Sequence, residues 1–147
     1  MQIIYPDTPI TSCPDLYLAG PTPRDPQIIS WRIEALDILN YNHFQGIVYV
    51  PERKSWIDVD YLDQVEWEYT AMMTSKVIAF WVPREIPTLY GFTTNVEFGF
   101  YLCQRPRHII YGRPMNAPHT RYLDWLYQKQ TGCEPKSSLQ DLLKELL

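Results

Sequence analysis

The sequence lacks several features that define whole classes of proteins. It has no apolar run close to the roughly 20 residues that a membrane-spanning helix needs, and its first residues do not form a basic segment followed by an apolar core. Its three cysteines, Cys13, Cys103 and Cys133, form no CxxC pair, which argues against a disulfide scaffold or a zinc ribbon. We therefore expect a cytoplasmic protein with no membrane partner.

Positive charge is also scarce. The chain has 13 Lys and Arg against 17 Asp and Glu, and a net charge of -4. Proteins that coat a nucleic-acid backbone need concentrated Lys and Arg, so we expect no nucleic-acid partner. A small phosphorylated ligand needs only one or two local donors and is compatible with this charge.

Three common catalytic signatures are absent from the sequence. There is no G-x-G-x-x-G for a dinucleotide, no G-x-x-x-x-G-K-[ST] for a P-loop and no G-x-S-x-G for a hydrolase triad. The histidines His43, His108 and His119 do not share the spacing of metal ligands. We expect neither a metal site nor a cofactor.

The sequence does contain a regular alternation of apolar strands and helical patterns, within 147 residues that suit a single domain, 1–147. Short apolar runs that end in Gly or Pro predict strands at 15–20, 46–51, 76–83 and 107–112. Helical spacing follows Ser30, a candidate cap, and recurs over Tyr61–Thr74, 97–104 and 121–129. This order predicts an α/β fold of βαβ units, with helices on both faces of a parallel sheet.

Both ends of the chain and one helix carry further predictions. Residues 1–14 hold three prolines and no helical period, which predicts an extended N-terminal arm. Residues 137–147 predict a C-terminal amphipathic helix, whose apolar residues are Leu139, Leu142, Leu143 and Leu146. In the helix over Tyr61–Thr74, one apolar stripe is predicted from Val65, Tyr69, Met72 and Met73.

Three loops leave the carboxyl ends of the predicted strands, where open parallel sheets bind their ligands. They comprise residues 19–26, 51–60 and 83–95. Glu97 follows the third loop, in the stretch TTNVEFG, which has no other charged residue. Its place at the ligand edge of the sheet makes Glu97 a candidate for chemistry.

Seven segments, taken in order, resemble the nucleoside 2-deoxyribosyltransferase-like family. They are LYLAGPTPR, SWRIEAL, GIVYVPE, QVEWE, KVIAFWVPRE, TLYGFTTNVEFG and YGRP, in a resemblance that spans roughly residues 15–127. The resemblance implies a flavodoxin-like fold, a three-layer sandwich whose parallel sheet has about five strands. It also implies a small nucleoside or nucleotide as the partner, and a homo-oligomer in which subunits complete one another's sites.

The same resemblance implies double-displacement chemistry at an N-glycosidic bond. A carboxylate attacks C1′ of the sugar, the base leaves with help from an acid, and a second base or water attacks the glycosyl-enzyme. Such chemistry needs two carboxyl groups of unequal character. The first expectation is 2-deoxyribosyl transfer; the alternatives are an N-glycoside hydrolase, a nucleotide-binding module on the same fold and, with no flavin motif, flavodoxin-like electron transfer.

By motif match, Glu97 would be the nucleophile. We place it in the first turn of a helix, where the macrodipole favours an anion by about 0.3–1 kcal/mol. Thr94-x-x-Glu97 also has the spacing of a capping box, so Glu97 could instead satisfy a backbone N–H.

The proton-handling carboxylate of the family pattern corresponds to Glu68, in the helix before the third strand. The family pattern carries Asp there, so the longer Glu68 is a departure. Glu66 lies about 200° away round the helix, so these two side chains cannot both face a pocket. Asp60 and Asp63 are weaker candidates, and a solvated helix face is the alternative for all four.

The resemblance also implies ligand contacts in the first loop. Gly20, Pro21, Thr22 and Arg24 would hold the sugar or a 5′ group, and the forked donors of Arg24 suit a phosphate. Arg24 could instead be an ordinary surface residue. Trp31 and Arg32 would belong to the scaffold, with Arg32 or Glu34 in a surface pair.

Three further residues each have two interpretations. Asn95 could hydrogen-bond a sugar hydroxyl or could start the helix. Trp81 or Tyr90 could stack on the base, or pack in the core as large rings often do.

Overall fold

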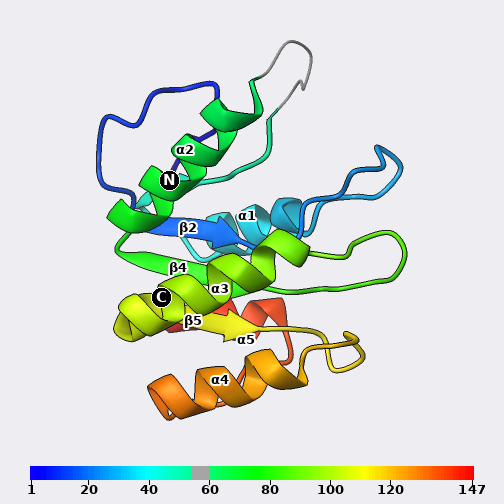
Figure 1. Cartoon of the computed structure of the whole chain (residues 1–147). Coiled ribbons are helices and arrows are strands. Elements are labelled where there is room, and N and C mark those ends of the chain that lie inside the picture. Colours follow the sequence, from blue (N-terminus) through cyan, green and yellow to red (C-terminus); the bar gives the residue numbers. More distant parts are fainter. Residues whose placement is uncertain (54–59) are drawn as a thin grey trace.

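The computed structural model describes residues 1–53 and 60–147. At its centre lies a sheet of five parallel strands, in the spatial order β1-β3-β2-β4-β5 (Figure 1). The strands are β1 (Gln2–Ile4), β2 (Leu16–Ala19), β3 (Ile47–Tyr49), β4 (Val77–Trp81) and β5 (Ile109–Gly112). The predicted flavodoxin-like α/β fold is confirmed. Most of the loop predicted over residues 51–60, namely 54–59, lies outside the described residues.

Helices cover both faces of the sheet (Figure 1). One face carries α2 (Tyr61–Thr74), α3 (Phe92–Gln104) and α4 (Arg121–Thr131); the other carries α1 (Trp31–Tyr41) and α5 (Leu139–Leu143). Short 3-10 turns, Pro106–His108 and Lys144–Leu146, follow α3 and α5. Within the described residues, no helix has both the length and the apolar character to cross a membrane.

Each face of the sheet has its own hydrophobic core. Phe80 of β4 points to the α3 side and packs edge-on against Phe98, with ring centroids 5.2 Å apart. Trp81, the next residue, belongs to the core beneath α1 and α5. Successive strand residues point to opposite faces, so a strand covered on both sides is apolar throughout.

The N-terminal arm contributes a strand that the sequence pattern did not indicate. Residues 2–4 form β1, which pairs in parallel with residues 47–49 of β3 at the edge of the sheet. Three residues are too few for an alternating pattern to be recognised.

The buried face of α2 differs from the predicted one. Val65 and Tyr69 are 38% and 48% exposed, while the buried residues are Gln64, Trp67, Ala71 and Met72. The predicted stripe was therefore wrong in half of its members. Val65 and Tyr69 line a cleft instead of the core.

Helix α3 begins earlier than predicted. It starts at Phe92, after Gly91, whose φ of 65° lies in the left-handed region that favours glycine. Glu97 therefore lies in the second turn, and no side chain caps this helix. Because the macrodipole acts mainly within the first turn, the first-turn and capping-box interpretations of Glu97 are both wrong.

The C-terminal segment packs on its own domain. Ser138 caps α5 by accepting a hydrogen bond from the N–H of Asp141 at 3.1 Å. Leu139, Leu142 and Leu143 are buried in the core beneath α1.

The order of the strands creates a crevice at the ligand edge. From β2 the chain passes through α1 to β3, which lies on one side of β2 in the sheet. From β3 it passes through α2 to β4, which lies on the other side of β2. The loops after β2 and β4 therefore diverge at the carboxyl ends of neighbouring strands. Such a topological switch point is where open α/β sheets bind ligands.

Candidate active site

A cleft of about 900 Å³ lies at this crevice. Helices α2 and α3 form its walls, and the loops after β2 and β4 contribute to its rim. It brings together the two predicted carboxylates, Glu68 of α2 and Glu97 of α3. A second hollow, of about 700 Å³ along residues 113–122, has no carboxylate in its lining. The predicted chemistry therefore corresponds to the first cleft.

Glu97 is half-buried in the cleft, and no described side chain donates a hydrogen bond to its carboxylate. Burial, and to a smaller extent the negative charge of Glu68, raise the pKa of Glu97 to about 7. The positive charge of Arg32 opposes the rise. Near neutral pH, a substantial fraction of Glu97 is thus protonated in the free protein.

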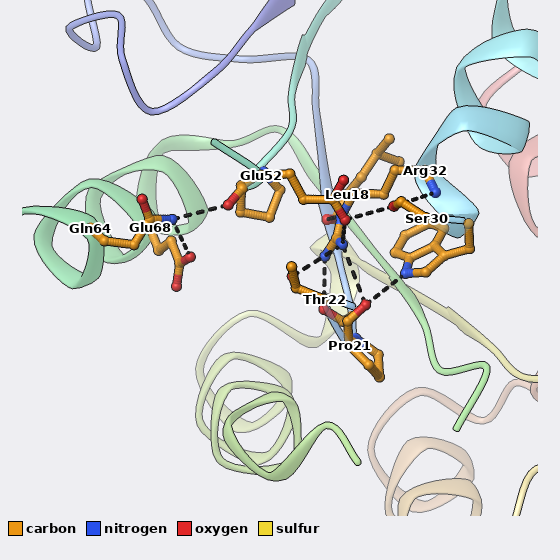
Figure 2. A network of polar contacts seen from close by, with 11 residues as sticks. Leu18, Pro21, Thr22, Ser30, Arg32, Glu52, Gln64 and Glu68 are labelled. Carbon is orange, nitrogen blue, oxygen red and sulfur yellow. Dashed lines mark hydrogen bonds and ion pairs between the residues drawn. The ribbon is translucent and has the colours of Figure 1, made fainter. Parts of the chain in front are cut away.

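The carboxylate of Glu68 has more support. Gln64, one turn earlier on α2, donates its Nε2–H to Glu68 Oε1 at 2.6 Å (Figure 2). Burial raises the pKa of Glu68, but this hydrogen bond and the positive charges of Arg32, Arg24 and Arg53 oppose the rise.

The two carboxyl groups therefore have unequal surroundings. Among the described residues, Glu68 has a hydrogen-bond donor and three nearby cations, whereas ionised Glu97 is stabilised by one cation, Arg32. When the pair shares one proton, that proton resides preferentially on Glu97. Glu66 is exposed and does not line the cleft, and Asp60 caps α2 by accepting from the N–H of Leu62.

Arg32, expected in a surface pair, is buried beside the cleft, so that expectation was wrong. It is 1% exposed, and its guanidinium donates to the carbonyl oxygens of Leu18, Gly20 and Pro21 and to Thr22 Oγ1 (Figure 2). β2 and the turn after it direct these four acceptors towards one point, which the forked donors of an arginine can satisfy together.

An ion pair completes the Arg32 cluster. Glu52 Oε1 lies 2.6 Å from Arg32 Nη1 and also accepts from Ser30 Oγ at 2.6 Å. Ser30 caps α1, as predicted, by accepting from the N–H of Arg32 at 3.2 Å. The sequence did contain a signal for the burial of Arg32, because its helical spacing to the apolar Ala35 and Leu39 places it on the same face of the helix.

The loop after β2 brings Gly20, Thr22 and Arg24 into the cleft lining, whereas Pro21 is buried behind it. Gly20 has a φ of 149°, and a Cβ there would lie 2.1 Å from the carbonyl oxygen of Trp81. Glycine therefore allows the start of this loop to pass close to β4. The side chain of Arg24 is exposed at the rim and has no ion-pair partner among the described residues.

The structure distinguishes between the two interpretations of the other three residues. Trp81 is 6% exposed in the core on the opposite face of the sheet, which favours its core interpretation over base stacking. Asn95 does not line the cleft, and its Oδ1 accepts from Arg84, which favours a structural role. Tyr90 lines the cleft and stacks on Phe92, with ring centroids 5.1 Å apart.

Aromatic residues that the sequence did not single out as ligand contacts also line the cleft, among them Tyr17, Tyr61, Tyr69, Phe100 and Tyr101. Burial, followed by the charges of Glu68 and Glu97, raises the pKa of Tyr17. Burial and the charge of Glu97 likewise raise the pKa of Tyr101. Both phenols stay protonated at neutral pH, so each can donate a hydrogen bond.

Comparison with known protein families decides the relationship of the chain. The family model described as nucleoside 2-deoxyribosyltransferase like matches residues 13–114. The chain belongs to the nucleoside 2-deoxyribosyltransferase-like family. The predicted family is confirmed, and the match includes both carboxylates, Glu68 and Glu97. No curated protein sequence matches the chain significantly.

This nucleoside 2-deoxyribosyltransferase-like chain has strands β2 to β5 and helices α1 to α3 within the family match. The cleft therefore lies in the part that defines the family, and a small nucleoside partner is consistent with that membership. In residues 1–53 and 60–147, no group of three or more His, Cys, Asp or Glu side chains is placed to hold a metal ion.

Proposed function

We propose that this protein transfers a 2-deoxyribosyl group between nucleobases through a covalent glycosyl-enzyme. The observation that carries the proposal is the meeting of Glu68 and Glu97 in one cleft, on different helices and in unequal surroundings. Family membership supports an enzyme of this family in general. The carboxylate pair supports double displacement, because one group must attack while the other moves a proton.

In the first half-reaction, an oxygen of ionised Glu97 forms a bond to C1′ while the bond from C1′ to the base nitrogen breaks. The electron pair of the broken bond goes to the base, and Glu68 gives its proton to a nitrogen of that base. In the second half-reaction, a nitrogen of the acceptor base bonds to C1′ and the Glu97 carboxylate leaves. The acceptor base passes its proton to Glu68, which restores the starting state.

These steps need one proton on the pair of carboxyl groups. With two protons Glu97 cannot attack, and with none Glu68 cannot assist the departing base. In the free protein the shared proton resides preferentially on Glu97, whose pKa is about 7. We infer that a bound nucleobase draws this proton to Glu68, because a base nitrogen accepts a hydrogen bond only from the protonated carboxyl group.

The rest of the cleft supports a nucleoside or nucleotide ligand. Gly20, Thr22 and Arg24 would hold the sugar and its 5′ group, and the guanidinium of Arg24, which has no ion-pair partner within residues 1–53 and 60–147, would suit a 5′-phosphate. Tyr90, which also lines the cleft, offers a flat ring against which a base could stack.

Assembly into a homo-oligomer is part of the proposal. Large apolar side chains are exposed along α2 and α3, on both sides of the cleft, and an accumulation of exposed apolar side chains commonly marks a protein interface. They are Tyr61, Leu62, Tyr69, Phe92, Val96 and Phe100.

Hydrolysis of the N-glycosidic bond is the second candidate function. It uses the same first half-reaction, and water replaces the acceptor base in the second. Glu97 is half-buried, not sealed from solvent, so water could reach the glycosyl-enzyme.

One assay separates these functions. The protein is incubated with deoxynucleosides and their 5′-monophosphates, with and without a free acceptor base, and the products are separated by chromatography. Base exchange supports transfer, and base release alone supports hydrolysis. Ligand binding without any turnover would overturn both enzymatic proposals in favour of a nucleotide-binding module.

A further inference from the structure

Gln64 lies at the floor of the cleft, one turn before Glu68 on α2, and is 3% exposed. Its side-chain oxygen accepts from Arg53 Nε at 2.6 Å. Its nitrogen lies 3.0 Å from the carbonyl oxygen of Pro51 and 2.6 Å from Glu68 Oε1 (Figure 2). Every polar atom of this amide thus has a partner.

The partners fix the orientation of the amide. An arginine N–H can only donate, so the atom of Gln64 that faces Arg53 must be the oxygen. A backbone carbonyl can only accept, so the atom that faces Pro51 must be the nitrogen. The amide group therefore cannot be flipped without losing both contacts, and it presents an N–H to Glu68.

The contact with Gln64 makes the two carboxylate oxygens of Glu68 inequivalent. Because Oε1 accepts from the amide of Gln64, and a carbonyl oxygen is a better acceptor than a hydroxyl oxygen, this contact favours Oε2 as the oxygen that carries a proton on Glu68. The amide also favours the ionised form of Glu68, since a hydrogen bond to a carboxylate stabilises its charge.

We propose that Gln64 is a positioning residue for the proposed transfer reaction, which assigns the proton exchanged with the nucleobase to Oε2 of Glu68. This inference rests on the proposed function for its role in catalysis. The geometry of the amide stands independently of it. Arg53 is in turn held by Asp7 at 2.8 Å, so the chain of contacts extends to the N-terminal arm.

Other charged and titratable groups also face Glu68 and influence its ionisation. They are Arg24 and Arg32 from the β2–α1 loop and α1, Arg53 after β3, Tyr17 of β2, and Glu97 and Tyr101 of α3. Among the described residues, Gln64 alone donates a hydrogen bond to Glu68. Substitution of Gln64 leaves the other groups in place.

The test uses Gln64→Met, which keeps the length of the side chain and removes the donor. Loss of a hydrogen bond to a charged group should raise the pKa of Glu68 by about one to two units. The pKa is measured by NMR of the 13C-labelled glutamate carboxyl groups, with the Glu68 signal assigned by its loss in Glu68→Gln. The acid limb of the pH profile of kcat/KM should move upward by a similar amount, because the doubly protonated pair persists to higher pH.

Two controls separate positioning from general stability. Glu66→Gln removes an exposed carboxylate from the same helix and should leave both readouts unchanged. In a Glu68→Gln background, Gln64→Met should cause little further loss of kcat/KM if it acts through Glu68. If Gln64→Met does not fold, Gln64→Asn keeps a buried amide but is one methylene too short to reach Glu68, and the same shift is expected.

The outcomes distinguish this inference from the proposed function. An upward shift of the Glu68 pKa without any wild-type turnover would support the positioning geometry and contradict the proposed reaction. Wild-type turnover with an unshifted Glu68 pKa and an unmoved acid limb in the Gln64 variants would overturn the positioning role. Equal losses from Gln64→Met in the presence and absence of Glu68 would overturn it as well.

Discussion

At the scale of single residues, the carboxyl group of Glu97 sits in surroundings that favour its neutral form. It lies in the second turn of α3 among aromatic side chains, with the charge of Glu68 nearby. In the proposed reaction the same group must be ionised when it attacks. Keeping Glu97 ionised in this cleft therefore costs free energy. A nucleophile accounts for that cost, because it must lie in the cleft to reach the substrate, whereas a purely structural role does not account for it.

This cost predicts a pH-dependent effect of Glu97→Gln on stability. The pKa of Glu97 is raised to about 7 in the folded protein, so the native state binds a proton that the unfolded state has lost. The resulting stabilisation is present at low pH and disappears as the pH rises through 7. At pH 8, where wild type must bury the charge, Glu97→Gln should be more stable by about 1–3 kcal/mol.

Urea unfolding at pH 5 and at pH 8 measures this difference. At pH 5 the two proteins should have similar free energies of unfolding, because Glu97 is largely protonated in the native state. An equal difference at both pH values would mean that burial does not raise the pKa of Glu97.

The proposed proton transfer by Glu68 can be tested with leaving groups of different basicity. Glu68→Gln should lower kcat/KM for an ordinary deoxynucleoside by about 10²–10⁴-fold, the usual contribution of a general acid. A substrate whose leaving group departs without protonation should lose much less. Parallel kinetics on the two substrates give the answer, and equal losses on both would contradict the acid role.

At the scale of elements, Arg32 joins α1 to the loop after β2 and to the segment after β3. Its guanidinium satisfies three carbonyl oxygens, a hydroxyl and the Glu52 carboxylate. The loop that carries Thr22 and Arg24 is thus fixed from behind. The ligand edge of β2 owes its shape to a side chain on the following helix.

Arg32→Ala should therefore lower the free energy of unfolding by about 3–5 kcal/mol, as expected when one partner of a buried ion pair is removed. Arg32→Lys should recover only part of this loss, because an ammonium cannot reproduce the forked geometry of the guanidinium. Glu34→Ala, at an exposed position of α1, should change stability by no more than about 0.5 kcal/mol. Chemical unfolding of the three variants measures these values, and a near-neutral Arg32→Ala would contradict the role assigned to the cluster.

The sequence predicted elements with strong patterns and missed those that depend on a few residues. The strands around residues 16–19 and 77–81 are long apolar runs ended by Gly or Pro, and these were predicted correctly. β1 has three residues and gains its identity only by pairing with β3. The start of α3 was missed because Gly91 ends a loop whose left-handed turn leaves no periodic signal.

The same distinction holds for the candidate site. Glu97 and Glu68 could be predicted from the family motifs, and the switch point followed from the alternation of elements. The burial of Arg32 was missed although its spacing to Ala35 and Leu39 was a signal, and the contacts of Gln64 could not be predicted, since a polar residue on a helix is usually exposed unless tertiary partners satisfy it. Those partners come from segments distant in the chain.

At the scale of the whole molecule, the fold leaves large apolar side chains of α2 and α3 exposed on either side of the cleft. Leu62 on α2 is 65% exposed, and Val96 on α3 is 73% exposed. These positions support assembly through the face that carries the site.

If that face is the interface, Leu62→Lys should shift the protein from an oligomer towards a monomer. Ile33→Lys is a matched control, because Ile33 is 56% exposed on α1, on the opposite face of the sheet. Sedimentation velocity over a range of concentrations gives the oligomeric state. A monomeric wild type, or equal effects of both substitutions, would contradict the proposed interface.

The central claim is that Glu97 forms a covalent bond with the sugar. The most direct measurement is the mass of the Glu97 peptide after the protein has been mixed with a deoxynucleoside, without an acceptor base, and quenched in acid. We predict a mass increase of one deoxyribosyl group on Glu97, with turnover reduced by at least about a thousandfold in Glu97→Ala. Turnover with no adduct on this peptide, or a Glu97→Ala variant within a few-fold of wild type, would contradict the account.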